Sequence, residues 1–445
     1  MRGLMLLALA TSVVADVAKA RDQTWTLSGS LRARLETVDG HARVGVNSSD
    51  TIWSSRLRVE ANGPLGAGWS GQAELYDSRT WGGDSGSPLS ANDVNTLELV
   101  QANVKRRWAE PFGKSSFANL QLGRMTLNLG SRRLIAADDY RNTTNGYTGA
   151  RIDLHWGSGV DLVALAVVPQ IRLPEAKADV LDNRGEADLE TSAQRLYGTI
   201  MTVPYGQQGL ASQWTLIRFE EEDRPSRPTR NRELTTFGIR LFREPKPGQF
   251  DHDFEVYSQN GQNRASLLPN APLRNVNAAY VRAEWGYQWK TAWRPRLSVE
   301  YDWASGDRLG ATDTRFDTLF GMRRAEISPA GILAAIGRSN LSSPGIRLEL
   351  EPSRNVDAFI AWRGLWLAEK TDSFASTGVL DRSGRSGDYA GQQLDSRLRV
   401  WLQPKKLRLE INAVLLAKGR FLKSAPNAPA SQNTSYLGID LIRSF

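Results

Sequence analysis

Arginine recurs at every second position in several stretches of the sequence. Arg32 and Arg34 are one such pair, and Arg397 and Arg399 are another. Successive side chains of a β-strand point to opposite faces, so residues two positions apart share a face. The guanidinium group is always charged, and its planar fork fits carboxylate and phosphate groups. The spacing therefore predicts charged faces that attract anions.

Residue types for other chemistry are scarce. The three histidines, His41, His155 and His252, are far apart and follow no metal-ligand spacing, and the chain contains no cysteine. The lack of cysteine excludes thiolate metal sites, cysteine nucleophiles and a disulfide framework. The sequence also holds neither a Gly-rich phosphate loop nor a zinc signature. We therefore expect no enzyme activity, no cofactor and no metal site.

The arginines lie in stretches of about ten residues in which apolar and polar side chains alternate, with turns or polar loops between the stretches. In the first stretch, Leu27, Leu31 and Leu35 alternate with polar residues that include Arg32 and Arg34. This is the period of a β-strand with one apolar and one polar face. In a sandwich the polar face would meet solvent and would not require arginine and carboxylate on nearly every strand. The pattern therefore favours a sheet that encloses its charged face.

The start of the chain indicates export. An apolar run from Leu4 to Ala15 follows Arg2, and residues 18–20 form a small-x-small cleavage site. We interpret residues 1–20 as a secretory signal peptide, with cleavage after Ala15 as the alternative, and residues 21–445 as one domain. Basic residues outnumber acidic ones by 56 to 48. An exported chain rarely meets nucleic acid, so we expect acidic polymers or small anions as its partners.

The rest of the chain has no apolar run of the ~18 residues that a membrane-spanning helix requires, whereas a barrel strand needs only about 9 to 11. Aromatic residues near the ends of the alternating stretches resemble the girdles of an outer-membrane barrel. They are Trp25, Trp53, Trp69, Trp81, Trp108, Trp156, Trp285, Trp303, Trp366 and Tyr436. The fold class we predict is all-β, a transmembrane antiparallel β-barrel of about 18 strands in the Gram-negative outer membrane.

The number of strands and the loops follow from the same pattern. A barrel of about 16 strands is the alternative, because residues 160–202 and 329–344 alternate poorly. Long polar stretches at residues 82–95, 220–233, 304–331 and 369–393 predict long extracellular loops. We expect at least one of them to plug the pore.

One stretch, from Leu122 to Leu154, resembles a known family, the alginate-export family of outer-membrane channels. The shared features are Gly123, Arg124, Gly130, Arg133, Leu134, Asp138, Asp139, Asn142, Gly149 and Arg151. Later segments extend the resemblance in the same order, at residues 235–241, 254–262, 301–307, 316–324 and 391–421. The family's aromatic-Asp-Gly reads Tyr147-Thr148-Gly149 here, so one acidic position is lost.

The resemblance implies a monomeric barrel with an arginine-rich pore and loops that plug or gate it. It also implies passive export of an anionic polysaccharide, an alginate-like polyuronate. The expected partners are this polysaccharide or oligosaccharide, outer-membrane lipid, the barrel-assembly machinery and periplasmic export proteins, and not nucleic acid. An anion-selective uptake porin for oligouronates or small organic acids is the alternative, because its pore chemistry would be the same.

The candidate site residues are inward-facing arginines and the carboxylates on the same face. They are Arg32, Arg34, Arg56, Arg58, Arg124, Arg133, Asp138, Asp139, Arg151, Arg240, Arg282, Glu284, Arg296, Glu300, Asp302, Arg347, Arg363, Asp395, Arg397 and Arg399. Carboxylates would keep the arginines from holding a conducted anion too tightly. A gating loop that mixes aromatic and charged groups is predicted at Asp307, Phe316, Asp317, Phe320, Arg323 and Arg324.

The last residues read as a closing strand. Leu437, Ile439 and Leu441 form an apolar face, and the chain ends on Phe445. A terminal aromatic residue resembles the signal that the barrel-assembly machinery reads. Arg443 departs from the apolar parity, and near the headgroups its long side chain could reach phosphate.

Overall fold

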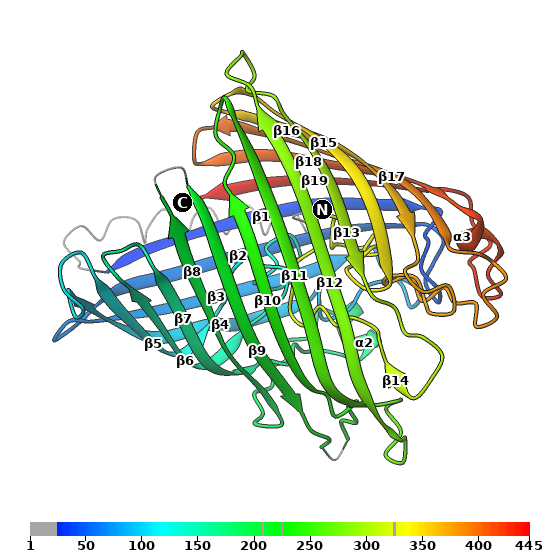
Figure 1. Cartoon of the computed structure of the whole chain (residues 1–445), viewed down its shortest axis with the longest axis horizontal. Helices are drawn as coiled ribbons and strands as arrows, with labels where there is room; N and C mark the ends of the chain where they lie inside the picture. The colour runs from blue at the N-terminus through cyan, green and yellow to red at the C-terminus, as the bar shows by residue number, and fades with distance from the viewer. Residues whose placement is uncertain (1–24, 207–208, 225, 324–325) are drawn as a thin grey trace.

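The structure is a computed structural model that describes residues 25–206, 209–224, 226–323 and 326–445. These residues form a closed antiparallel β-barrel of 18 strands (Figure 1). The predicted fold class is confirmed, and the alternative of 16 strands is wrong. The predicted signal peptide and Arg324 lie outside the described residues. No helix in the described part of the chain is long and apolar enough to span a membrane.

The barrel strands follow one another around the sheet in chain order. They are β1 (Thr26–Asp39), β2 (Asp50–Gly66), β3 (Trp69–Trp81), β4 (Asn95–Ala109), β5 (Phe117–Met125), β6 (Tyr147–His155), β7 (Asp161–Pro169), β8 (Gln194–Tyr205), β9 (Leu210–Glu221), β10 (Glu233–Arg243), β11 (Gln249–Arg264), β12 (Leu273–Gln288), β13 (Arg296–Ala304), β15 (Leu341–Ser353), β16 (Val356–Trp366), β17 (Tyr389–Gln403), β18 (Leu407–Lys418) and β19 (Thr434–Ser444). Two short helices, α2 (Lys177–Leu181) and α3 (Arg420–Ser424), lie in connections, and the two-residue β14 (Thr312–Asp313) pairs with β12 from within a loop.

The barrel closes where β1 pairs with β19, from Ser30 opposite Ser444 to Asp39 opposite Ser435. The terminal residue completes this seam, because the Gly29 N–H donates to the Phe445 carbonyl (3.0 Å) and the Phe445 N–H donates back (3.1 Å). Each barrel strand therefore has two hydrogen-bonded neighbours, and among the described residues no edge strand exposes its backbone to lipid.

The two ends of the barrel differ in their connections. Short turns join β2 to β3, β8 to β9 and β10 to β11, and the first and last strands begin and end on the same side (Figure 1). Long loops emerge at the other end. Tight turns mark the periplasmic end of such a barrel. The four predicted long loops lie at the long-loop end, as residues 82–94, 222–232, 305–340 and 367–388. Three further long loops, residues 126–146, 170–193 and 419–433, were not predicted.

Loop residues fill the interior and form an apolar cluster with the barrel wall. Phe320, from the loop between β13 and β15, lies 5.6 Å from the Tyr147 ring and 5.6 Å from the Phe219 ring. Phe316, from the same loop, stacks on Tyr280 at 5.5 Å. The protein's hydrophobic core thus lies inside the barrel, where this loop plugs the lumen.

This core explains why residues 160–202 alternate poorly. Leu165 and Val167 of β7 point inward but pack in the apolar cluster. The strand is therefore apolar on both faces. Most of residues 329–344 belong to the plugging loop, and β15 begins only at Leu341.

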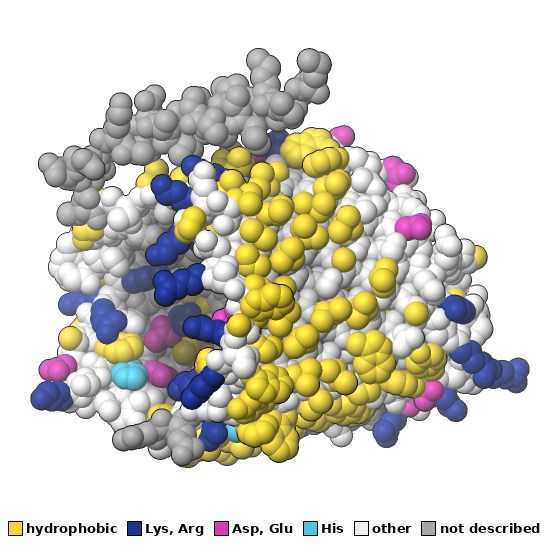
Figure 2. All heavy atoms as spheres, turned by 90° about the horizontal axis from the view of Figure 1, so that it is seen from above, with side chains coloured by type: hydrophobic (Ala, Val, Ile, Leu, Met, Phe, Trp, Pro, Cys, Tyr) yellow, Lys and Arg dark blue, Asp and Glu magenta, His cyan; other side chains and the backbone are white. Residues whose placement is uncertain are grey.

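The outer surface is apolar, as Figure 2 shows for one side of the barrel. Leu437 and Leu441 of β19 face outward, as the sequence predicts, and Trp53 and Trp285 are more than half exposed. The prediction that Tyr436 belongs to the outer aromatic girdle is wrong. Its ring points inward, where its hydroxyl donates to Glu36 (2.7 Å), because it lies on the parity opposite to Leu437.

Candidate anion-binding pore

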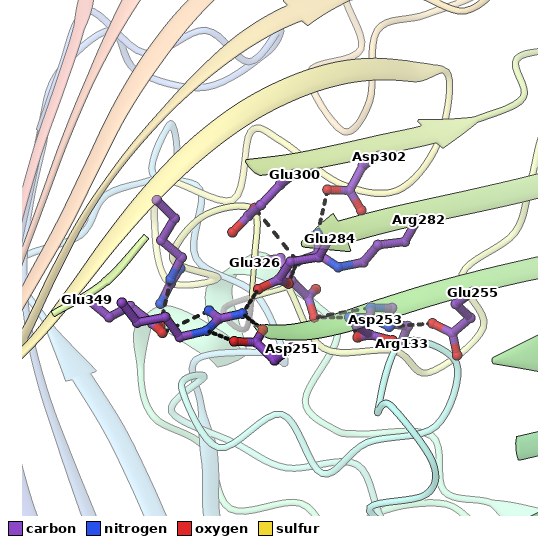
Figure 3. Close-up of polar contacts among 12 residues, drawn as sticks. Arg133, Asp251, Asp253, Glu255, Arg282, Glu284, Glu300, Asp302, Glu326 and Glu349 are labelled. Atoms are coloured by element: carbon purple, nitrogen blue, oxygen red, sulfur yellow. Dashed lines mark hydrogen bonds and ion pairs between the residues drawn. The ribbon is translucent and has the colours of Figure 1, made fainter. Parts of the chain in front are cut away.

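Most charged side chains of the lumen form ion pairs along the wall. Arg282 of β12 pairs with Asp302 of β13 (2.8 Å) and with Glu284. Arg363 of β16 reaches the same Asp302 (2.9 Å) and Glu300. Figure 3 shows the three carboxylates of this group turned toward Arg282. The guanidinium charges on this part of the wall are therefore neutralised.

Glu326 ties the plugging loop to this network. Arg133, from the loop between β5 and β6, reaches Glu326 (3.0 Å), Glu255 (2.5 Å) and Asp253 (2.7 Å) (Figure 3). Arg338, from the plugging loop itself, also pairs with Glu326. Burial raises the pKa of Glu326, but the two guanidinium groups outweigh burial and hold that pKa well below its usual range. These ion pairs join two loops to the wall.

A second group of arginines holds the loop between β5 and β6 by its backbone. Arg32 donates to the carbonyls of Tyr140 (3.2 Å) and Arg141 (2.8 Å). Arg34 donates to the Tyr140 carbonyl (2.8 Å) and pairs with Asp440 (2.6 Å). These β1 side chains point into the lumen, where they fix the loop in place.

A third group of arginines lines a cavity together with the carboxylates of Asp93, Asp138 and Glu175. Arg43, Arg141, Arg172 and Arg323 come from four different loops and line one cavity of about 640 Å³. Arg141 pairs with Asp138 (2.9 Å). In the described part of the chain, no carboxylate oxygen lies within 4.0 Å of the guanidinium nitrogens of the other three. We call these four residues the arginine cluster.

Side-chain amides join two members of the cluster. Asn92 accepts from Arg141 (2.7 Å) and from Arg172 (2.6 Å). Asn145 accepts from the same two arginines. Neutral amides satisfy the N–H donors but leave the positive charge in place.

The surroundings of the cluster disfavour its charge. Burial, then the neighbouring charge of Arg141, lowers the pKa of Arg172 to about 10. Burial and the same neighbour lower the pKa of Arg323 to about 10. An anion that entered the cavity would relieve this repulsion, because an opposite charge stabilises the protonated form.

The structure places most of the predicted site arginines in ion pairs. Those paired with a carboxylate are Arg32, Arg34, Arg58, Arg124, Arg133, Arg151, Arg240, Arg282, Arg296, Arg347, Arg363, Arg397 and Arg399. Arg56 donates to the carbonyls of Asp139 and Arg141. Glu284, Glu300 and Asp302 lie in the wall network, Asp395 is buried on the inner face of β17, and Asp138 lies at the cavity.

The predicted gating residues belong to one loop. Phe316, Asp317, Phe320 and Arg323 lie inside the lumen, and only Arg323 and Phe320 line the cavity of the arginine cluster. Asp307 pairs with Arg274 (2.9 Å) at the start of the loop. The residues predicted from the sequence do not include Arg43, Arg141 and Arg172, because these three lie in loops, which show no alternation of apolar and polar residues. The presence of Arg141 within the family-like stretch was the one available signal.

Comparison with known proteins gives a family and a fold. The family model described as alginate export matches residues 24–435. No curated protein matches the sequence. Among solved structures, Pseudomonas aeruginosa OccK8 (OprE) is similar at 10% identity and a TM-score of 0.60, over 95% of this chain and 98% of the other. Pseudomonas aeruginosa OpdQ is similar at 11% identity and a TM-score of 0.59, over 95% of this chain and 99% of the other.

A third similar structure is Pseudomonas aeruginosa OccK2 (OpdF) in complex with glucuronate, at 12% identity and a TM-score of 0.56, over 94% and 98% of the two chains. At these identities the likeness concerns the fold. All three chains are matched over nearly their full length. The family match and the fold therefore cover the same single barrel.

Proposed function

This protein of the Gram-negative outer membrane belongs to the alginate export family, and we propose that it conducts an anionic polysaccharide, an alginate-like polyuronate, outward through its arginine-lined lumen. Passage is passive, so synthesis or a gradient would supply the energy. The arginine cluster carries the proposal, because it places four guanidinium groups around one cavity, and in the described part of the chain only that of Arg141 lies within 4.0 Å of a carboxylate oxygen. Each sugar of a polyuronate bears one carboxylate, which a guanidinium fork binds well.

The lumen contains arginines that are paired with carboxylates and arginines that are not, and this difference suits conduction. A pore with low-dielectric walls focuses the field of its fixed charges and raises the local concentration of counter-ions. Conduction also requires that an anion leave, so binding must be weak or spread over several sites. We assign the attraction of the anion to the arginine cluster. We assign bracing to wall arginines such as Arg282 and Arg363, whose charge is matched by carboxylates.

The polar side chains near the cluster can contact sugar hydroxyl groups. Gln170 and Gln194 line the same cavity as Asn92 and Asn145. Amides both donate and accept hydrogen bonds, as hydroxyl groups require. A polymer longer than the cavity would need the plugging loop to shift, so that loop is the proposed gate.

Uptake of small uronates is the second candidate function. The cavity volume of about 640 Å³ lies within the range of about 300 to 1,000 Å³ typical of small-ligand sites. A barrel of the same fold was also solved in complex with glucuronate. The two functions share the pore chemistry and differ in the size of the conducted anion.

Planar-bilayer recording of the full-length protein distinguishes them. We expect anion-selective current that oligouronates block from one side, with block growing stronger as the oligomer lengthens. Block that does not depend on length, with free passage of monomeric glucuronate, would favour the uptake function. A cation-selective current would contradict both. An oligosaccharide of the same length without carboxylates is the matched control, and we expect it to leave the current unchanged.

A further inference from the structure

The lipid-facing wall carries an arginine beside the periplasmic turn between β2 and β3. The guanidinium carbon of Arg106 lies 5.6 Å from the centre of the Trp69 ring and 5.3 Å from that of the Trp108 ring. Arg106 is opposite Trp69 on β3 and opposite Leu120 on β5. Both rings are on the outer face, at the short-turn end of the barrel.

Arg106 faces outward because the register of β4 shifts. The pairing with β3 is irregular between Leu99 and Gln101, and beyond that point the even-numbered residues face lipid. The next residue, Arg107, therefore points into the lumen, where it lies 4.1 Å from the centre of the Phe117 ring. The two adjacent arginines are on opposite sides of the wall.

No ion pair neutralises Arg106. Its contacts are the faces of Trp69 and Trp108, and no carboxylate of the described chain lies within 4.0 Å of its guanidinium nitrogens. An uncompensated cation is costly at the edge of the hydrocarbon region unless it meets a headgroup phosphate. The two tryptophan rings hold the guanidinium at the depth where aromatic residues mark the interface.

An apolar groove adjoins this arginine on the same outer face. It has a volume of about 430 Å³ and is lined by Leu65, Gly66, Ala67, Trp69 and Val104. Gly66, with φ of +89°, has no side chain to close it, and a Cβ atom there would meet nothing within 4 Å. The groove therefore has an apolar floor, and its Trp69 ring also contacts Arg106.

We propose that Arg106 and this groove form a binding site for one anionic phospholipid of the periplasmic leaflet. The phosphate accepts hydrogen bonds from Arg106, and one acyl chain lies in the groove against Trp69 and Val104. The position at the short-turn end assigns the lipid to the periplasmic leaflet, and the positive charge favours an anionic headgroup. This site is separate from the lumen and does not depend on the conducted substrate.

Native mass spectrometry of the delipidated full-length protein tests the proposal, with phosphatidylglycerol and phosphatidylcholine of identical acyl chains as probes. We expect the protein to retain phosphatidylglycerol preferentially, and Arg106→Gln to weaken its apparent affinity about tenfold, as loss of one charge-assisted hydrogen bond predicts. Arg107→Gln removes the same charge from the adjacent residue inside the barrel. We expect this control to bind as the unmodified protein does.

Two further variants separate the headgroup from the acyl chain. Arg106→Lys should retain most of the affinity, because the charge remains. Val104→Trp should weaken binding although Arg106 is intact, because the new ring fills the groove. The proposal is wrong if Arg106→Gln binds phosphatidylglycerol as tightly as Arg107→Gln does. Equal retention of phosphatidylcholine and phosphatidylglycerol by the unmodified protein would also overturn it.

Discussion

Substitution of Arg172 by Gln is the most direct test of the arginine cluster. Arg172 is partly buried and donates to neutral oxygens, among them Asn92 Oδ1 (2.6 Å) and the Ala91 carbonyl (3.3 Å). Its removal therefore leaves no carboxylate without a partner. Asn92 and Asn145 keep their bonds to Arg141. We expect a loss of only about 1 kcal/mol of stability, the usual net value of hydrogen bonds between protein groups.

The effect on a bound uronate should be larger. At about 4 Å and an effective dielectric constant of about 20, a guanidinium attracts a carboxylate by about 4 kcal/mol. The cost of removing both groups from water reduces the net gain to about 1.5 to 3 kcal/mol, the range of hydrogen bonds to charged groups. Loss of Arg172 should therefore raise the half-blocking concentration of an oligouronate about tenfold to a hundredfold.

Planar-bilayer recording supplies the assay, and Arg399→Gln supplies the control. Arg399 lies on the inner wall of β17, where it pairs with Glu410 (2.7 Å), so its removal changes the net charge equally. We expect Arg172→Gln to weaken block and shift the reversal potential in a salt gradient toward lower anion selectivity, and Arg399→Gln to change both much less. Equal effects of the two substitutions would refute the assignment of selectivity to the cluster, as would unchanged block in Arg172→Gln.

Three further predictions concern the loops and the seam. Glu326→Gln leaves the buried Arg338 unpaired, so we expect a loss of about 3 to 5 kcal/mol, seen as a lower unfolding temperature in detergent and a noisier open-channel current. Burial and, second, the charge of Glu98 raise the pKa of Asp188 to about 7. The protonated Asp188 carboxyl therefore stabilises the docked loop fully below the ordinary carboxyl pKa, and this stabilisation is lost as pH rises through about 7. Conductance should therefore increase as pH rises from about 4 to about 7, and a flat profile in the unmodified protein, or an unchanged one in Asp188→Asn, would contradict this. Deletion of Phe445 removes two backbone hydrogen bonds to Gly29, and we expect less heat-modifiable folded protein in outer-membrane fractions, with normal selectivity in the barrels that assemble.

The barrel could be predicted from the sequence because most of its strands show the alternation of apolar and polar residues. In β1, the alternation of Leu31 and Leu35 with Arg32 and Arg34 determines which face meets lipid and which faces the lumen. The pattern does not reveal the partners of those arginines. Arg32 binds the backbone of Tyr140, 108 residues away in the sequence, and only the closed barrel brings the two together.

The contacts of the loops could not be predicted, because loop residues follow no fixed period and pack against several strands. Leu165 on β7 faces inward but is apolar, since Phe320 and other loop residues cover the wall at that level. This strand therefore lacks the alternation of apolar and polar residues by which the neighbouring strands are recognised. Arg43 and Arg172 lie in loops where spacing has no fixed meaning, so the sequence does not indicate that they line one cavity.

The arginine cluster is formed by loops, so closure of the lumen and anion selectivity are linked. Arg43, Arg141, Arg172 and Arg323 belong to the loops that follow β1, β5, β7 and β13, and the last of these loops also plugs the lumen. Most wall arginines are paired with carboxylates, whereas the arginine cluster is assembled only while these loops are docked. A movement that widens the lumen must also separate the cluster. Variants that open the pore, such as Glu326→Gln, should therefore lose anion selectivity as conductance rises, whereas an independent gate would let conductance increase with selectivity unchanged.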